Sequence, residues 1–290
     1  MPPSIRSLDA GPALRCIVFA SDFSPASQAA LPHAARLARV FGAFVYALYV
    51  IEIQPWEICP EVTLQSRIDA TQLLDEVTRS KEWDGIRVQA ALRHGSAVAQ
   101  IIRFAQEHSA DLIVTGAGSR HRLRHLLLGS VAEQLAQTAP CPVLTIRSDA
   151  NPPATEEGGF RNIVLATGAN AGAAAGISYA AKFSNRFGAR LWIAHSLRPD
   201  GGGNDSERSW LSKLVPHREG VAPIFEIGTV EQVTVMLAQR ESADLVMLAP
   251  GLGWLLPKLV QHLACPVMSV RYAIPMIRPK SFGAEIALNS

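Results

Sequence analysis

The sequence lacks the features that mark several large classes of protein. Its longest uninterrupted apolar stretch, residues 43–51, is about half of the roughly 20 residues that a membrane-spanning helix needs. Lys and Arg number 27 against 25 Asp and Glu, so the basic excess of a nucleic-acid-binding protein is missing. Residues 1–15 show no apolar segment typical of a secretory signal. We therefore expect a cytoplasmic protein that binds neither membrane nor nucleic acid.

Cysteine is scarce, and the familiar catalytic motifs are missing. The four cysteines form no C-x-x-C pair and no metal-ligand spacing, which predicts reduced and mostly buried thiols and no metal site. The motifs G-x-S-x-G, H-E-x-x-H and G-x-x-x-x-G-K-[ST] do not occur, so serine-hydrolase, zinc-protease and P-loop chemistries lack their parts. We predict no catalytic residue and no enzyme. The cysteines are Cys16, Cys59, Cys141 and Cys265.

What the chain does contain is a repeat. Its 290 residues, 48% hydrophobic and 18% charged, are enough for two folded domains of ordinary size. Three short segments recur in order: CIVFA at 16–20 as NIVLA at 162–166, SADL at 109–112 and 242–245, and CPV at 141–143 and 265–267. The chain therefore carries two copies of one domain, the second shortened in two places. We predict domain 1 at 14–147, a linker at 148–160, a degenerate domain 2 at 161–271 and a C-terminal tail at 272–290.

Within the first copy, short β-rich apolar runs alternate with helical patterns. This alternation predicts an α/β fold, with a doubly wound, five-stranded parallel sheet in each copy and helices on both faces. Ser24 before Pro25 is a typical helix start, and Pro32 predicts a kink in the same helix. The predicted strands are 16–20, 44–50, 86–92, 111–115 and 143–146, and the predicted helices are 25–41, 64–82, 96–108 and 131–138.

Two segments of the first copy lie where such folds bind ligands, beyond the carboxyl ends of the strands. Ser21 and Asp22 follow the first strand, and the glycine-containing segment 115–119 follows the fourth. Gly129 and Ser130 then open a helix. A helix amino terminus presents unpaired N–H groups and the positive end of a dipole, and nearby glycines let the backbone approach closely. This combination suits a phosphate group.

The same segments resemble the universal stress protein family. The resemblance is carried by IVFASDFS at 17–24, DLIVTGAGSR at 111–120, LLLGSVAE at 126–133 and APCPV at 139–143. It covers nearly all of the first copy and, in weakened form, the second. Members of this family are small α/β domains, dimeric or in tandem, and a subset binds ATP through G-x2-G-x9-G-[ST]. Here the pattern falls on Gly116, Ser119, Gly129 and Ser130, with serine in place of the second glycine.

The resemblance implies a stress-response protein whose first copy binds ATP or a related adenine nucleotide; whether Mg²⁺ accompanies it stays open. Asp22 would face the adenine and ribose end, and the loop before Ser130 would hold ribose and phosphates. A serine held in a left-handed conformation at 119 would cost about 1–2 kcal/mol. The implied ligand-binding residues are Ala20, Ser21, Asp22, Val50, Thr115, Gly116, Ser119, Gly129, Ser130, Val131 and Ala132.

The second copy departs from this pattern. Gly168 stands where the first copy has Asp22, and Trp254 stands where it has Ser130. We expect a partner domain that binds no ligand. Family members pair through their last strands, so the resemblance implies that 143–146 and 267–270 pair within this chain, which would protect two strand edges. It also implies that two chains form a homodimer.

Each of these features also has a purely structural interpretation. Asp22 could cap the first helix, and Ser130 with Glu133 could form a capping box. The basic stretch 120–125 could contact phosphates or be a solvated loop. Three functions therefore stay open: a nucleotide-binding protein without catalysis, a ligand-free dimeric scaffold or regulatory protein-interaction module, and an enzyme acting on an adenylate. The last would need His121 or His125 as its base.

Overall fold

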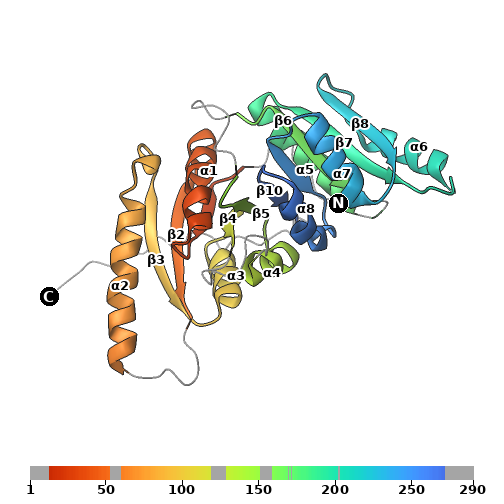
Figure 1. Cartoon of the computed structure of the whole chain (residues 1–290). Helices are drawn as coiled ribbons and strands as arrows, with labels where there is room; N and C mark the ends of the chain where they lie inside the picture. The colour runs from red at the N-terminus through yellow and green to blue at the C-terminus, as the bar shows by residue number, and fades with distance from the viewer. Residues whose placement is uncertain are drawn as a thin grey trace, which may run out of the picture.

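The computed structural model describes residues 13–52, 60–118, 129–150, 159–168, 170, 172–201 and 203–271, without the side chains of 60–63 and 66. These residues form one ten-stranded sheet flanked by helices, in the order β3-β2-β1-β4-β5-β10-β9-β6-β7-β8. Figure 1 shows the two halves side by side, with β5 and β10 meeting in the middle and β3 and β8 at the outer edges. The α/β prediction with two doubly wound halves is confirmed.

In the first half the strands are β1 (Cys16–Ala20), β2 (Phe44–Ile51), β3 (Val88–His94), β4 (Leu112–Ala117) and β5 (Val143–Arg147). The helices are α1 (Pro25–Phe41), α2 (Pro60–Thr78), the short 3-10 helix η1 (Lys81–Trp83), α3 (Ala97–Glu107) and α4 (Ser130–Thr138). All strand pairs in this half are parallel. Helix α1 continues through Pro32 as one helical element.

In the second half the strands are β6 (Asn162–Thr167), β7 (Arg190–Leu197), β8 (Val221–Ile227), β9 (Leu245–Leu248) and β10 (Val267–Ser269). The helices are α5 (Gly172–Phe187), α6 (Asn204–Leu214), α7 (Val230–Arg240), the 3-10 helix η2 (Gly253–Leu255) and α8 (Leu256–His262). These strands are parallel to one another as well. No helix in the described part of the chain is long and apolar enough to cross a membrane.

The sheet of the first half is buried on both faces. Alternate residues of β1 point to opposite sides: Ile17 and Phe19 pack in the core with α1, and Val18 and Ala20 pack in a second core with α3 and α4. Both faces are therefore apolar, which explains why the strands read as continuous hydrophobic runs rather than alternating ones.

The prediction that one helix spans residues 64–82 is wrong at its end. Helix α2 stops at Thr78, and Ser80 caps the separate helix η1. This break allows Trp83 to turn inward, where its ring packs edge-on against Phe19 with centroids 5.8 Å apart. The following Ile86 donates its N–H to Trp83 O, so strand β3 begins at Val88, two positions later than predicted.

The repeat is visible in matching contacts. Asp111 accepts the backbone N–H groups of Arg15 and Cys16 at the start of β1, at 2.7 and 3.1 Å. Asp244 likewise accepts those of Arg161 and Asn162 at the start of β6, at 2.7 and 3.3 Å. In both copies the carboxylate of the SAD motif therefore anchors the first strand of its half.

The predicted pairing of the last strands is confirmed. Strands β5 and β10 are antiparallel, with Leu144 opposite Met268. An arginine at or just beyond the end of each strand crosses to the other half. Arg147, the last residue of β5, donates to Val260 O of α8 at 2.7 Å, and Arg271, two residues after β10, donates to Ala139 O at the end of α4 at 2.9 Å. A cation at the carboxyl end of a helix satisfies unpaired carbonyls and complements the helix dipole. Each half thus caps a helix of the other.

Candidate functional site

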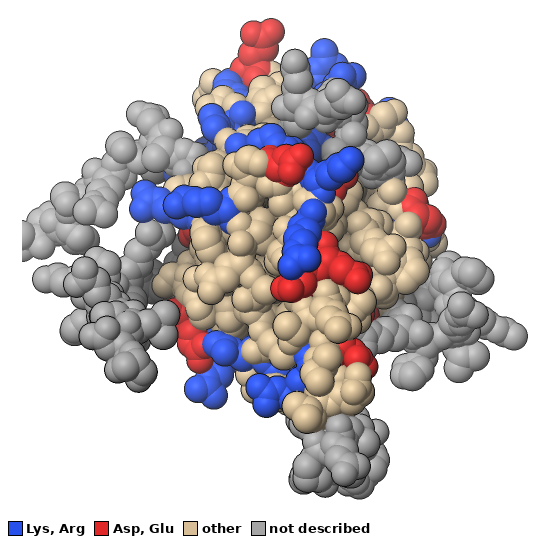
Figure 2. Space-filling view, turned by 90° about the vertical axis from the view of Figure 1, so that its left-hand side faces the viewer, with Lys and Arg blue, Asp and Glu red and all other residues tan. Residues whose placement is uncertain are grey.

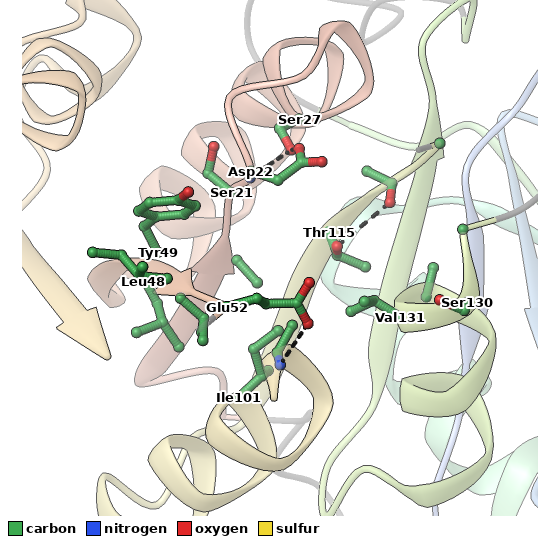
Figure 3. Close-up of a pocket in the computed structure, with 18 residues that line it drawn as sticks. Ser21, Asp22, Ser27, Leu48, Tyr49, Glu52, Ile101, Thr115, Ser130 and Val131 are labelled. Carbon is green, nitrogen blue, oxygen red and sulfur yellow. Dashed lines mark hydrogen bonds between the residues drawn. The ribbon is translucent and has the colours of Figure 1, made fainter. Parts of the chain in front are cut away.

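The first half contains a pocket of about 460 Å³ at the carboxyl ends of its strands. It lies where β1, β2 and β4 end, so it spans the point at which the strand order reverses between β1 and β4. The first turns of α3 and α4 complete its wall, and Figure 3 shows side chains from all these elements converging. The lining residues are Ala20, Ser21, Asp22, Ser27, Leu48, Tyr49, Val50, Ile51, Glu52, Ala97, Ile101, Thr115, Gly116, Gly118, Gly129, Ser130, Val131 and Ala132.

The turn between β1 and α1 is braced by short-range hydrogen bonds. Asp22 Oδ1 accepts the N–H of Ser24 at 3.1 Å and the hydroxyl of Ser27 at 2.5 Å. Ser24 is the N-cap of α1 and accepts the N–H of Ser27. Phe23, between Asp22 and Ser24, has a φ of 61°, and its ring packs on Tyr49 with centroids 4.7 Å apart. Asp22 therefore holds the turn in shape as well as lining the pocket.

Helix α4 points its amino end into the pocket. Its N-cap is Gly129 and its first residue is Ser130, so the capping box of Ser130 with Glu133 that the sequence suggested is not formed. A Cβ at Gly129 would lie 2.6 Å from Gly118 O, so this close approach requires glycine. The first N–H groups of α4 consequently have no side-chain cap from Gly129 and face a space that a ligand can enter.

Helix α3 borders the same pocket, but its amino end is already occupied. Its N-cap, Ser96, makes no side-chain hydrogen bond to the helix. Instead Glu52, the residue directly after β2, accepts the N–H of Ala97 with Oε1 at 3.1 Å. The pocket is therefore bordered by three helix amino ends: that of α1 is capped by Ser24, and that of α3 is capped by a carboxylate that follows the neighbouring strand β2.

The structure brings together ten of the eleven residues predicted to bind a ligand: all except Ser119 line this pocket. Ser119 lies outside the described residues, as does the basic stretch 120–125. Sequence reasoning missed the contributions of Ser27, Leu48, Tyr49 and Glu52 and of Ala97 and Ile101 on α3. Glu52 could have been found, because it is an acidic residue at the carboxyl end of a predicted strand.

At the equivalent strand ends, the second half carries buried polar side chains that contact one another. Thr167 and His195, at the positions of Ser21 and Tyr49 in the repeat, are fully buried. The Thr167 hydroxyl lies 3.1 Å from His195 Nδ1, and His195 Nε2 lies 3.4 Å from Glu207 Oε2 of α6. Residue 168, which replaces the aspartate, is a glycine whose added Cβ would meet Asn170. The second half therefore has a buried hydrogen-bonded chain at positions that correspond to the pocket residues Ser21 and Tyr49 of the first half.

The loop after β9 in the second half packs on the first half instead of forming a phosphate site. A Cβ added at Gly253 would collide with Ala136 O of α4, so η2 lies directly against that helix. Trp254, which occupies the position of Ser130 in the repeat, is about half exposed at 51%, with the Lys258 ammonium 5.7 Å from its ring centroid.

The three cysteines in the described part of the chain are unreactive by environment. Burial, with a contribution from Asp111, raises the pKa of Cys16 to about 11. Burial likewise raises the pKa of Cys141 and of Cys265 to about 12. Because the thiolate is the nucleophile and the metal ligand, these thiols serve packing. No group of three or more His, Cys, Asp or Glu residues that could hold a metal ion occurs among the described residues.

The fold and the pocket together define an α/β protein with two doubly wound halves, in which the first half keeps an open site at its strand-order switch point. Comparison with known proteins extends this assignment. The model of the universal stress protein family matches residues 14–147. The universal stress protein MJ0531 of Methanocaldococcus jannaschii is 34% identical over 140 residues, covering 45% of this chain and 81% of that protein.

Further relatives support the same conclusion. The universal stress protein YxiE of Bacillus subtilis is 25% identical over 144 residues, which is 45% of this chain and 97% of that protein. Among solved structures, a universal stress protein from Archaeoglobus fulgidus has a TM-score of 0.71 at 18% identity, covering 88% of this chain and 98% of the other. The similarity of this structure shows that both halves share its fold. The chain belongs to the universal stress protein family.

Proposed function

We propose that the first half of this stress-response protein binds ATP or a related adenine nucleotide, and that the second half is a partner domain that binds none. The observation that carries the proposal is the pocket itself, which gathers the predicted residues of β1, β2 and β4 around the amino end of α4, where the N-cap Gly129 has no side chain. At about 460 Å³ it falls within the usual range of small-molecule sites, roughly 300–1,000 Å³.

The two ends of the pocket suit the two ends of a nucleotide. The amino end of α4, with the backbone at Gly129, Ser130 and Val131, offers N–H donors and a positive dipole end to phosphates. Leu48 and Val50 of β2 are buried and offer apolar surface to a base. Among the described lining residues the charged side chains are both carboxylates, so helix α4 supplies the attraction for phosphate.

Ser130→Glu is the sharpest variant for testing this site. Ser130 is exposed and is the first residue of α4, where a glutamate is favourable for the helix. Its carboxylate would occupy or repel the phosphate position, so binding should be lost while the thermal midpoint without ligand stays unchanged or rises. Ser130→Ala is the matched control, because it keeps the backbone donors. An alanine at Asp22 is a poorer choice, since Asp22 braces the β1–α1 turn.

The measurement is thermal unfolding with and without Mg-ATP, ADP and AMP at millimolar concentration. A ligand at 100 times its dissociation constant adds about 2.7 kcal/mol of stability. We expect a nucleotide-dependent rise in the midpoint for the wild type and for Ser130→Ala, and none for Ser130→Glu. If nucleotide still raises the thermal midpoint of Ser130→Glu, the binding site lies elsewhere. If no nucleotide raises the midpoint of the wild type, the proposal is refuted.

The same reasoning favours binding over turnover. The pocket carboxylates that could act as bases, Asp22 and Glu52, are each engaged in holding a backbone turn or a helix end. We therefore propose a cytoplasmic binding protein without catalysis, which forms homodimers in addition to the pairing of β5 with β10 inside one chain. Measuring phosphate release from ATP over time would test the lack of turnover.

A second candidate, a scaffold that acts through protein contacts, is favoured by one observation on α2. Leu64 is 60% exposed and Ile68, one turn further along, is 44% exposed. Figure 2 views the molecule from the α2 and β3 side and shows Lys and Arg interspersed with Asp and Glu, with uncharged surface between them. If no nucleotide raises the midpoint, this apolar pair is where a protein contact should be sought.

A further inference from the structure

The pocket contains a carboxylate that neither the family pattern nor the binding-site prediction includes. Glu52 directly follows β2, and Figure 3 shows its side chain extending from that strand across the pocket. In this view the carboxylate lies between the β2 residues Leu48 and Tyr49 on one side and Val131 and Ser130 of α4 on the other. It therefore stands between the apolar end of the pocket and the helix end that suits phosphates.

Only one of the two carboxylate oxygens is used within the described part of the chain. Oε1 accepts the N–H of Ala97 at 3.1 Å, and this bond fixes the side chain in place of a cap from Ser96. Oε2 forms no hydrogen bond to a described residue. Glu52 is exposed, so without a ligand Oε2 faces water, and it is available to accept a hydrogen bond from a donor group of a molecule bound in the pocket.

The position of Glu52 also restricts how a ligand can lie. The amino ends of α1, α3 and α4 border the pocket; Ser24 caps that of α1, and the Glu52 carboxylate occupies that of α3. A phosphate placed beside it would meet a like charge, so phosphates are directed to α4. In a nucleotide, the group between the base and the phosphates is the sugar, whose hydroxyls are donors. In doubly wound sheets generally, an acidic side chain following a strand can hold ribose hydroxyls.

We propose that Glu52 recognises the ribose hydroxyls of the bound nucleotide through Oε2 and thereby selects ribonucleotides over 2′-deoxyribonucleotides. This inference rests on the proposed nucleotide function and adds to it a specificity-determining residue. The proposal assigns Glu52 two tasks that can be separated by substitution: one oxygen caps α3, and the other binds the ligand.

Titration calorimetry with ATP and with 2′-deoxy-ATP tests the assignment. A hydrogen bond to a charged group is worth enough that the wild type should prefer ATP by about tenfold or more. Glu52→Gln keeps an oxygen for Ala97 N–H but removes the charge, so it should fold normally and reduce the preference. Glu52→Ala removes the acceptor altogether and should bind the two nucleotides equally. Glu107→Gln, an identical charge change at the far end of α3, should leave the preference unchanged.

The possible outcomes separate the two proposals. If the wild type binds no nucleotide, both the proposed function and this inference fail. If it binds ATP but Glu52→Ala weakens ATP and 2′-deoxy-ATP by the same factor, nucleotide binding stands and the role of Glu52 in reading the sugar is wrong. A preference that falls in the order wild type, Glu52→Gln, Glu52→Ala supports the assignment. The thermal midpoints of both variants show whether loss of the α3 cap alone accounts for any change.

Discussion

The substitution Gly116→Ala tests how closely the end of β4 approaches helix α1. A Cβ added there would lie 2.5 Å from the carbonyl carbon of Ala26, 2.6 Å from Ser27 N and 2.8 Å from Ala26 Cβ. Ordinary contacts between carbon atoms lie at about 3.5–4.0 Å, so the strand and the helix would have to separate by roughly 1 Å. Two of the three atoms are backbone and cannot swing away. Gly116→Ala should therefore strain the packing of the first half.

The magnitude follows from two opposing effects. Inserting a methylene group into a packed interior costs about 1–3 kcal/mol, and this site belongs at the upper end because backbone is involved. Replacing glycine also restricts the unfolded chain, which returns about 0.4–1 kcal/mol. The net loss is about 2–2.5 kcal/mol, which lowers a thermal midpoint by roughly 4–10 °C. Differential scanning calorimetry measures it directly.

Gly159→Ala is the control, because its new Cβ would lie 3.7 Å from Phe187 O in ordinary contact, and its midpoint should not fall. Gly176 provides a second test, in the other half. There the Cβ would lie 2.7 Å from Ala249 Cβ, so Gly176→Ala should destabilise although alanine is the better helix former. An unchanged midpoint for Gly116→Ala would refute the close approach of β4 and α1.

Three further predictions concern other parts of the molecule. In a Cys59→Ser background, Ellman's reagent at pH 8 should find no rapidly reacting thiol until denaturant is added, since the remaining thiols have raised pKa values; a fast native phase would contradict this. A hydrogen bond from Arg147 lowers the pKa of the Asp149 carboxyl group. The stability that this contact adds to the folded protein is present above the ordinary pKa of an aspartate and is lost as the pH falls through the lowered pKa. Asp149→Asn should therefore lower the thermal midpoint slightly at pH 7, and the midpoints of variant and wild type should converge in acid. Thr167→Val leaves buried His195 Nδ1 without its hydroxyl partner and should cost about 1–3 kcal/mol in urea unfolding, whereas equal stability would show that this contact contributes nothing.

Local patterns in the sequence predict most of the fold. The bounds of β1 and α1 agree with the structure because apolar runs, a serine cap and Pro25 are signals within a few residues of each other. The second helix was predicted poorly because it stops at Thr78, which lets Trp83 pack on Phe19, a contact between residues far apart in the chain. Contacts of this kind leave no periodic signal.

The pocket likewise has features that the sequence predicts and features that it does not. Residues on strand ends and on glycine-containing loops could be assigned, because the family pattern and the rule on strand carboxyl ends both point to them. The sequence could point to Glu52 as a pocket residue but not to its contact with α3, because its partner Ala97 is 45 positions away. The buried polar chain of the second half could not be predicted either: its Thr167 and His195 are joined to Glu207 of α6, which only the tertiary structure brings near.

The second half contributes to the pocket without lining it. Helix α4 presents its amino end to the pocket, and its carboxyl end is capped by Arg271 from beyond β10. Its side is held by η2, at the glycine contact between Gly253 and Ala136. Only nine residues long, α4 would be marginal as an isolated helix, so its position depends on these contacts. The second copy therefore helps to fix the helix whose amino end borders the pocket of the first copy, a connection that sequence similarity between the copies does not reveal.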